Sequence, residues 1–124
     1  MTELHESGED YIEAILRIQK DNGICRSVDV ARKLNVSKPS VSRAMGILEE
    51  NGYITVGNAG ALELTQKGRE KAESVYGRHV LLTNFLVKIT GVSLAQAEEN
   101  ACRIEHDIDE DVKVGIEKWM KSNS

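Results

Sequence analysis

The chain has 124 residues, of which 40% are hydrophobic and 29% are charged, with a formal net charge of −4 and one proline. This composition excludes a disordered or fibrous protein and leaves room for one compact domain, or for a small domain with a helical extension. No apolar run approaches the roughly 20 residues of a membrane-spanning helix, and the amino terminus lacks a signal-peptide pattern, so we expect a cytoplasmic protein that makes no membrane contact.

Charge is distributed unevenly along the sequence. Residues 26–43 carry five basic side chains against one acidic side chain, whereas residues 98–117 carry eight acidic side chains against two basic ones. The first segment therefore suits phosphates, and the second suits cations.

The first predicted element is a helix over residues 8–20. Apolar residues such as Ile12, Ile15 and Leu16 recur there at helical spacing, and "DNG" after them is a turn signal. Asp10 and Glu13 fall on the helical face away from this apolar arc. Taken alone, the two carboxylates are most simply explained as a solvated surface.

Two short helices joined by a tight turn are predicted in "SVDVARKLNVSKPSVSRAMGILEENGYITV". Ser27 is expected to cap the first helix, and Asn35 and Val36 are expected to form the turn. Ser37 should cap the second helix, with Pro39 in its first turn, where a missing N–H does no harm. This arrangement is the helix-turn-helix pattern, whose second helix can enter a DNA major groove.

A β-hairpin is predicted after the two helices. "GYITV" and "ALELT" alternate as strands do, around the glycine-rich tip "GNAGA". Helix-turn-helix and hairpin together make a winged helix, which we predict to bind double-stranded DNA; the alternative is a helical hairpin that binds protein. The residues expected to contact DNA are Arg26, Ser37, Lys38, Pro39, Ser40, Ser42, Arg43 and Asn58.

The second half is predicted to be entirely helical. A long helix over residues 66–90 ends at Gly91, and Ser93 begins the next helix. A last helix over residues 109–121 has an apolar side that needs a partner surface. That side consists of Val112, Ile116, Trp119 and Met120.

Three potential metal ligands follow one another in the middle helix of this half. Cys102, Glu105 and His106 are spaced i, i+3 and i+4, so we expect their side chains on one helical face. Sulfur, oxygen and nitrogen donors then converge, as a transition-metal site requires. A solvated helix edge can show the same residues by chance.

The order of these elements, with "YGRHVLLTNFL" in the long helix and "CRIEHDID" after it, resembles the diphtheria-toxin-repressor family of metal-dependent transcriptional regulators, which includes the manganese transport regulators. The resemblance implies a winged helix-turn-helix DNA-binding domain over residues 1–65 and an all-helical metal-binding and dimerisation domain over residues 66–124. It implies a homodimer that binds a palindromic operator when metal is bound, and so controls metal uptake or homeostasis. The residues expected to make the dimer contact are Val112, Ile116, Trp119 and Met120. The larger members append an SH3-like domain; the sequence ends at Ser124, so we expect the short form without it.

The resemblance also implies a set of metal ligands. Carried over to the matching motifs, they are Asp10, Glu13, His79, Cys102, Glu105 and His106. The set is a hybrid: Thr83 and Glu98 stand where iron-type regulators have an ancillary glutamate and histidine, and Cys102 stands where manganese regulators have a glutamate. We expect Fe(II) or Mn(II), with cobalt, nickel and zinc as further candidates in vitro. One ion per subunit is expected. The alternative is a second ion held by Glu13 and His79, with Glu105 or Glu98.

Two other functions compete with this prediction. A winged-helix regulator that needs no metal would carry these donors as accidents of its surface. An enzyme could use Cys102 and His106 as nucleophile and base, or could use the metal to activate water. The sequence has no glycine-rich oxyanion loop or phosphate cradle, so we expect no catalytic activity.

Overall fold

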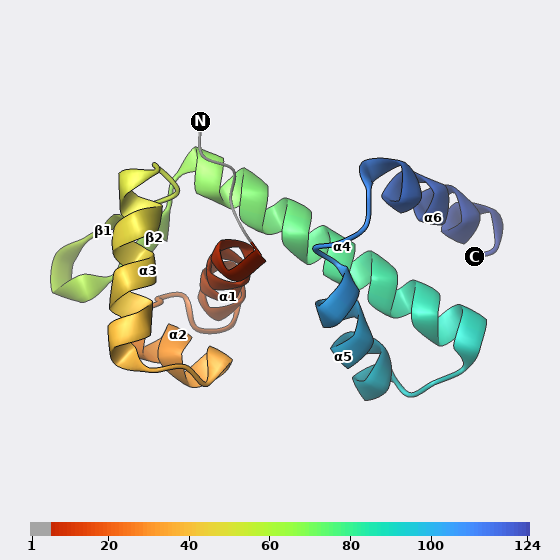
Figure 1. The fold of residues 1–124 in the computed structure, drawn as a ribbon, viewed down its shortest axis with the longest axis horizontal. Coiled ribbons are helices and arrows are strands. Elements are labelled where there is room, and N and C mark those ends of the chain that lie inside the picture. The colour runs from red at the N-terminus through yellow and green to blue at the C-terminus, as the bar shows by residue number, and fades with distance from the viewer. Residues whose placement is uncertain (1–5) are drawn as a thin grey trace. The chain divides into compact units, whose positions relative to one another are not determined.

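A computed structural model of the chain describes residues 6–124, which divide between two compact units, Met1–Glu73 and Ser74–Ser124. The structure is mainly helical with one small β-hairpin, so the predicted fold class is confirmed (Figure 1). The elements in chain order are α1 (Glu6–Asn22), α2 (Ser27–Leu34), α3 (Lys38–Glu50), β1 (Ile54–Val56), the 3₁₀ turn η1 (Asn58–Gly60), β2 (Leu62–Leu64), α4 (Gln66–Thr90), α5 (Leu94–Ile104) and α6 (Glu110–Ser122).

The boundary between the two compact units lies inside α4. The predicted boundary between functional domains, at residues 65 and 66, lies where α4 begins and stays a prediction. None of the helices in residues 6–124 is both long and apolar enough to cross a lipid bilayer.

An apolar core joins the three helices of the first unit. Ile12 and Ile15 of α1, Val30 of α2, and Val41 and Leu48 of α3 are almost completely buried. Each helix buries one stripe at three- and four-residue spacing. Burial of one side chain of this size contributes about 1.5–3 kcal/mol to the stability of the fold. These residues therefore hold the helix-turn-helix together.

Local hydrogen bonds set the starts of α2 and α3. Ser37 caps α3 as predicted, since its Oγ accepts a hydrogen bond from the N–H three residues later at 3.2 Å. The prediction that Ser27 caps α2 is wrong: Ser27 is the first helical residue, and Arg26 is the N-cap. The Arg26 N–H donates to Asp29 Oδ2 at 3.0 Å, because the carboxylate satisfies an amide that no helical carbonyl reaches.

The wing is a two-stranded antiparallel sheet that begins and ends against α4. β1 and β2 pair with Ile54 opposite Leu64. Beyond the strands, the Thr65 N–H donates to the Tyr53 carbonyl at 3.0 Å. Gly68, in the first turn of α4, lies against the same carbonyl, and a Cβ at Gly68 would be 1.9 Å from the Tyr53 oxygen. Only glycine fits this close approach.

The second unit consists of the remainder of α4 with α5 and α6. Gly91, with φ 77°, follows the end of α4, and Ser93 caps α5, both as predicted. Ala97 of α5 is completely buried. Trp119 of α6 meets Phe85 of α4 edge to face, with 5.5 Å between the ring centroids, and so packs α6 against α4.

Candidate metal centre and nucleic-acid interface

Asp10 and Glu13 are carried by α1, in the first unit. Asp10 is half-buried, but Glu13 is only 5% exposed, so the expectation of a solvated surface is wrong for Glu13. The Arg17 guanidinium, one turn later, lies 3.7 Å from Glu13 Oε2. A carboxylate this well buried is stable only with a compensating charge or strong hydrogen bonds.

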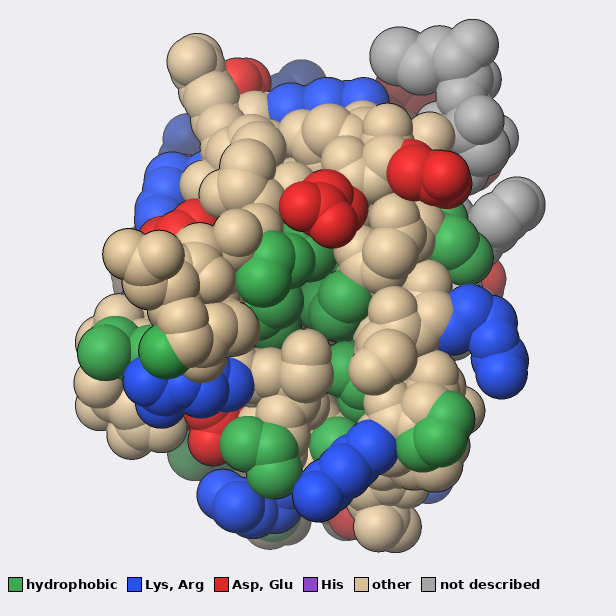
Figure 2. All heavy atoms as spheres, turned by 90° about the vertical axis from the view of Figure 1, so that its left-hand side faces the viewer, with side chains coloured by type: hydrophobic (Ala, Val, Ile, Leu, Met, Phe, Trp, Pro, Cys, Tyr) green, Lys and Arg blue, Asp and Glu red, His purple; other side chains and the backbone are tan. Residues whose placement is uncertain are grey.

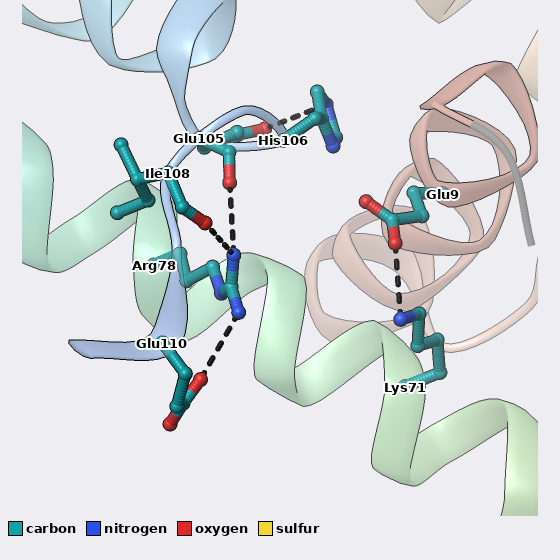
Figure 3. A network of polar contacts seen from close by, with 7 residues as sticks. All are labelled: Glu9, Lys71, Arg78, Glu105, His106, Ile108 and Glu110. Carbon is teal, nitrogen blue, oxygen red and sulfur yellow. Dashed lines mark hydrogen bonds and ion pairs between the residues drawn. The ribbon is translucent and has the colours of Figure 1, made fainter. Parts of the chain in front are cut away.

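In the second unit one carboxylate contacts two imidazoles. His79 Nδ1 on α4 lies 2.9 Å from Glu105 Oε2, and His106 Nε2 lies 3.4 Å from Glu105 Oε1 (Figure 3 shows the second contact). Glu105 is 1% exposed and His79 is 6% exposed. One buried carboxylate therefore lies between two imidazoles.

The helix that carries these donors ends earlier than predicted. α5 stops at Ile104, so Glu105 and His106 lie in the following turn, although Glu105 keeps helical backbone angles, with φ −62° and ψ −24°. The Glu105 N–H donates to the Ala101 carbonyl at 2.9 Å, which makes Glu105 the C-cap. The expectation that Cys102, Glu105 and His106 share one helical face stays a prediction.

Cys102 and Glu98 differ from His79, Glu105 and His106 in their surroundings. Cys102 is exposed on α5, and Glu98 is half-buried on the same helix. Among the residues that the structure describes, neither belongs to a group of three or more donor atoms within 4.8 Å of one another. Thr83, one turn after His79, has a buried hydroxyl without a hydrogen-bond partner in residues 6–124.

The donors of the second unit suit a divalent transition metal. Imidazole and carboxylate are ligands that iron, manganese and zinc share in proteins. The buried Glu105 carboxylate requires a nearby positive charge, which either a protonated imidazole or a metal ion can supply. Since imidazole binds metal in its neutral form, His79 and His106 could exchange a proton for an ion without leaving Glu105 uncompensated.

An arginine that the sequence analysis did not single out holds the turn that carries Glu105. Arg78 Nη1 donates to the Glu105 carbonyl at 3.4 Å and to the Ile108 carbonyl at 3.1 Å, and Nη2 donates to Glu110 Oε2 at 3.1 Å (Figure 3). Arg78 directly precedes His79 in "GRHVLL". No spacing rule separates it from an ordinary surface arginine, because its partners lie 27–32 residues away.

The predicted DNA contacts of α3 lie mostly on its exposed side. Val41, Met45 and Leu48 face the core. Ser37 donates to the half-buried Ser40 hydroxyl at 2.8 Å, so these two serines also stabilise the helix start. Figure 2 views the molecule from the side of α3 and the wing, and shows an apolar patch with basic side chains below it and to its sides and acidic side chains above it. The remaining predicted contacts on this helix, all exposed, are Lys38, Pro39, Ser42 and Arg43.

The other two predicted DNA contacts are associated with the wing. Asn58 begins η1 at the tip of the hairpin and is exposed. Arg26 Nε donates to the Ala59 carbonyl at 3.1 Å, which holds the exposed arginine beside that tip. Asn35, with φ 55°, adopts the left-handed conformation in the turn between α2 and α3, as the predicted helix-turn-helix requires.

An apolar hollow of about 360 Å³ lies between α4 and α6. Trp119 and Val112 remain 39% and 47% exposed, and Ile116 and Met120 are half-buried. An exposed apolar surface of this kind is typical of a protein interface. The hollow is lined by Phe85, Ile89, Val112, Gly115, Ile116 and Trp119.

Two family models match almost the whole sequence. One is described as the iron dependent repressor, N-terminal DNA binding domain, over residues 3–62, and the other as the iron dependent repressor, metal binding and dimerisation domain, over residues 65–122. An uncharacterised HTH-type transcriptional regulator of Methanocaldococcus jannaschii is 30% identical over 119 residues, which are 95% of each chain.

Longer relatives match as well. The iron-dependent repressor IdeR of Mycobacterium bovis is 33% identical over 122 residues, 98% of this chain and 53% of the relative, so the chain spans about half the length of that repressor. The solved structure of a manganese-dependent transcriptional repressor in complex with manganese is 26% identical, with a TM-score of 0.85 over 92% of this chain and 52% of that one.

Proposed function

Since the chain belongs to the iron-dependent repressor family, we propose that it is a metal-dependent transcriptional regulator, which binds duplex DNA as a homodimer when a divalent ion is bound. The observation that carries the proposal is the buried Glu105 carboxylate between His79 and His106, in a chain that also has a helix-turn-helix. The protein would act in the cytoplasm, where it represses genes for metal uptake or homeostasis. It is a regulator and not an enzyme.

The metal ligands proposed for the second unit are His79, Glu105 and His106. A divalent ion, when bound there, supplies the positive charge that the buried carboxylate needs. Asp10, Glu13 and Cys102 are proposed as further ligands. For Asp10 and Glu13 the support is the resemblance of "EDYIEAIL" to the first helix of the family, together with the burial of Glu13; for Cys102 it is the resemblance alone.

Regulation follows from linkage between metal and DNA. If both units contribute ligands, metal affinity depends on their arrangement, and a bound ion shifts the population toward the arrangement that binds it best. In a twofold dimer that arrangement sets the spacing of the two recognition helices, and a palindromic operator matches one spacing.

DNA contact is proposed for the exposed side of α3 and for the wing. Arg43 and Ser42 would reach base edges, whereas Lys38 and Asn58 would hold phosphates. Arg26 lies beside the wing through its bond to the Ala59 carbonyl and can present its other guanidinium nitrogens to the backbone of the duplex. The negative net charge does not oppose this interface, since the acidic excess lies at residues 98–117.

The experiment that tests the proposal measures DNA affinity with and without metal. Palindromic sites are first selected from random duplexes with protein supplied with Mn(II) or anaerobic Fe(II). Fluorescence anisotropy then follows the apo protein on such a site at fixed salt, with Mn(II), Fe(II) and Zn(II) added separately, because salt alone changes phosphate binding. We expect one ion to tighten binding about tenfold or more, a coupling of about 1.4 kcal/mol.

Matched variants test whether the proposed ligands cause the metal response of DNA binding. Glu105→Gln and His79→Ala should lose the metal response, whereas Glu73→Gln, which alters an exposed carboxylate on α4, should keep it. Equal DNA affinity with every ion and with chelator would instead identify a winged-helix regulator that needs no metal.

A further inference from the structure

Arg78 contacts three points on the short segment between α5 and α6. Its side chain is 22% exposed, and its two terminal nitrogens reach the Glu105 carbonyl, the Ile108 carbonyl and the Glu110 carboxylate (Figure 3). The segment has left α5 and not yet entered α6, so its carbonyls lack the partners that a continuing helix would provide. The arginine therefore supplies hydrogen bonds that the backbone cannot make for itself.

Two adjacent residues of α4 fix both ends of Glu105. Arg78 donates to its backbone carbonyl at 3.4 Å, while His79 Nδ1 lies 2.9 Å from its side-chain Oε2. The carboxylate can point at His79 reproducibly only if the backbone from which it extends is held in place. α5 supports the Glu105 N–H through the Ala101 carbonyl, and Arg78 supports the Glu105 carbonyl, which lies beyond the last helical residue.

The hydrogen bonds from Arg78 to the two backbone carbonyls contribute more to holding the turn than its ion pair with Glu110. Glu110 is 64% exposed, and an ion pair to a carboxylate that solvent reaches so freely contributes little. The Glu105 carbonyl lies at the C-terminus of α5, where the helix dipole favours a positive charge. The rigid, planar guanidinium can serve several acceptors at once, which a lysine ammonium does with less fixed geometry.

We propose that Arg78 is a positioning residue of the metal centre: it holds the Glu105–Ile108 turn so that Glu105 faces His79, and through Glu110 it fastens that turn to the first turn of α6. The inference rests on the proposed function of His79 and Glu105. Arg78 is itself a permanent cation and cannot ligate a metal, so it acts only through Glu105.

The test uses Co(II) as the metal probe, because its visible absorption reports the coordination geometry. Arg78→Ala should weaken Co(II) binding about tenfold or more, the usual effect of removing a group that orients a ligand, and should change the Co(II) band. Arg78→Lys should fall between Arg78→Ala and the unchanged protein. Glu110→Gln should have a small effect. Arg69→Ala is the matched control, since Arg69 lies on the same helix in an exposed pair with Glu73.

A second measurement needs no metal. Trp119 is the only tryptophan in the sequence and packs on Phe85, so its emission reports how α6 lies against α4. In the apo protein, Arg78→Ala should shift this emission, because the first turn of α6 loses its tie to α4, and Arg69→Ala should leave it unchanged.

The outcomes separate this inference from the proposed function. If His79→Ala and Glu105→Gln lose Co(II) while Arg78→Ala and Arg78→Lys bind it with unchanged affinity and spectrum, the inference is overturned and the metal centre stands. If Arg78→Ala has a lower unfolding midpoint but binds Co(II) as before, Arg78 only stabilises the fold and the inference is likewise overturned. If His79→Ala and Glu105→Gln bind Co(II) as well as the unchanged protein, both proposals fail. If Arg78→Ala does not fold, the Co(II) affinity and spectrum of Arg78→Lys test the inference in its place.

Discussion

Glu105 is a buried carboxylate, and burying its charge costs the fold free energy. Its carboxylate is 1% exposed, and its side-chain contacts are two imidazoles that are neutral or charged according to their protonation. A glutamine of the same shape would remove the charge and retain one acceptor. A buried carboxylate of this kind adds little to stability, so its presence supports the proposal that Glu105 binds a cation.

Gly68 is required by a close approach between two pieces of backbone. In Gly68→Ala the new Cβ would overlap the Tyr53 oxygen, at 1.9 Å, so the start of α4 and the wing must move apart. We expect a loss of about 1–3 kcal/mol in the free energy of unfolding, the usual cost of an overpacked site. Urea denaturation measures this loss. Gly46→Ala, where a Cβ would meet nothing within 4 Å, is the control, and equal midpoints for the two variants would contradict the prediction.

The two cysteines should differ sharply in reactivity. Burial, with the negative charge of Asp29 as a smaller cause, raises the pKa of the Cys25 thiol to about 12, whereas Cys102 is exposed. Because the thiolate is the reactive form, at pH 8 a disulfide reagent should modify Cys102 rapidly, and Cys25 only as the protein unfolds. Absorbance of the released thiol measures both rates.

A serine variant provides the control for the cysteine experiment. In Cys102→Ser the rapid phase should disappear, and unfolding in urea should restore one reactive thiol. If Cys102 is a ligand, added Zn(II) should also slow its modification. Two equal rates in the native protein would contradict the assigned burial of Cys25.

At the scale of elements, the contact between α4 and the end of α5 brings the candidate donors together. Glu105 is the C-cap of α5, and its N–H still donates to the Ala101 carbonyl. Its carboxylate meets His79, which α4 supplies from 26 residues earlier in the chain. The packing of the two helices therefore matters as much as the residue types in "CRIEHDID".

α6 carries the surface proposed for dimerisation. Val112 is 47% exposed and lines the apolar hollow with Trp119, so a partner that covers them would bury apolar area. Val112→Glu should weaken the dimer by about 2 kcal/mol or more, as the loss of an apolar interface anchor commonly does. Sedimentation equilibrium measures the change. Lys118→Glu changes the charge of an exposed residue of the same helix and should leave the dimer intact; equal weakening by both would place the interface elsewhere.

For the whole molecule, metal and DNA should strengthen each other's binding by the same factor. If an ion tightens operator binding tenfold, a saturating operator must tighten the binding of that ion tenfold, because the coupling free energy is reciprocal. Competition with a fluorescent chelator measures metal affinity with and without the duplex. A duplex of scrambled sequence at the same salt is the control. An effect in one direction only would show that metal and DNA do not share a two-state equilibrium.

Much of the fold could be predicted because its signals are local. The helical spacing of apolar residues, the Ser37 cap, the glycines at turns and the alternating strands each depend on residues a few positions apart, and they correctly predicted α3, the wing and the length of α4. For the candidate site, residue spacing pointed to Cys102, Glu105 and His106, and the family resemblance added Asp10, Glu13 and His79. Which of those ligands bind metal stays a prediction until the variants are measured.

Only the tertiary structure decided the environment of each donor. Whether Glu105 is buried depends on α4, and the Arg78 contacts join residues about 30 positions apart, so no periodicity within one helix could reveal them. Gly68 likewise looks like any helix glycine until Tyr53 is placed beside it. Local sequence determines which elements form, because hydrogen bonds and apolar stripes repeat within them; burial and charge compensation arise between elements, and only packing determines them.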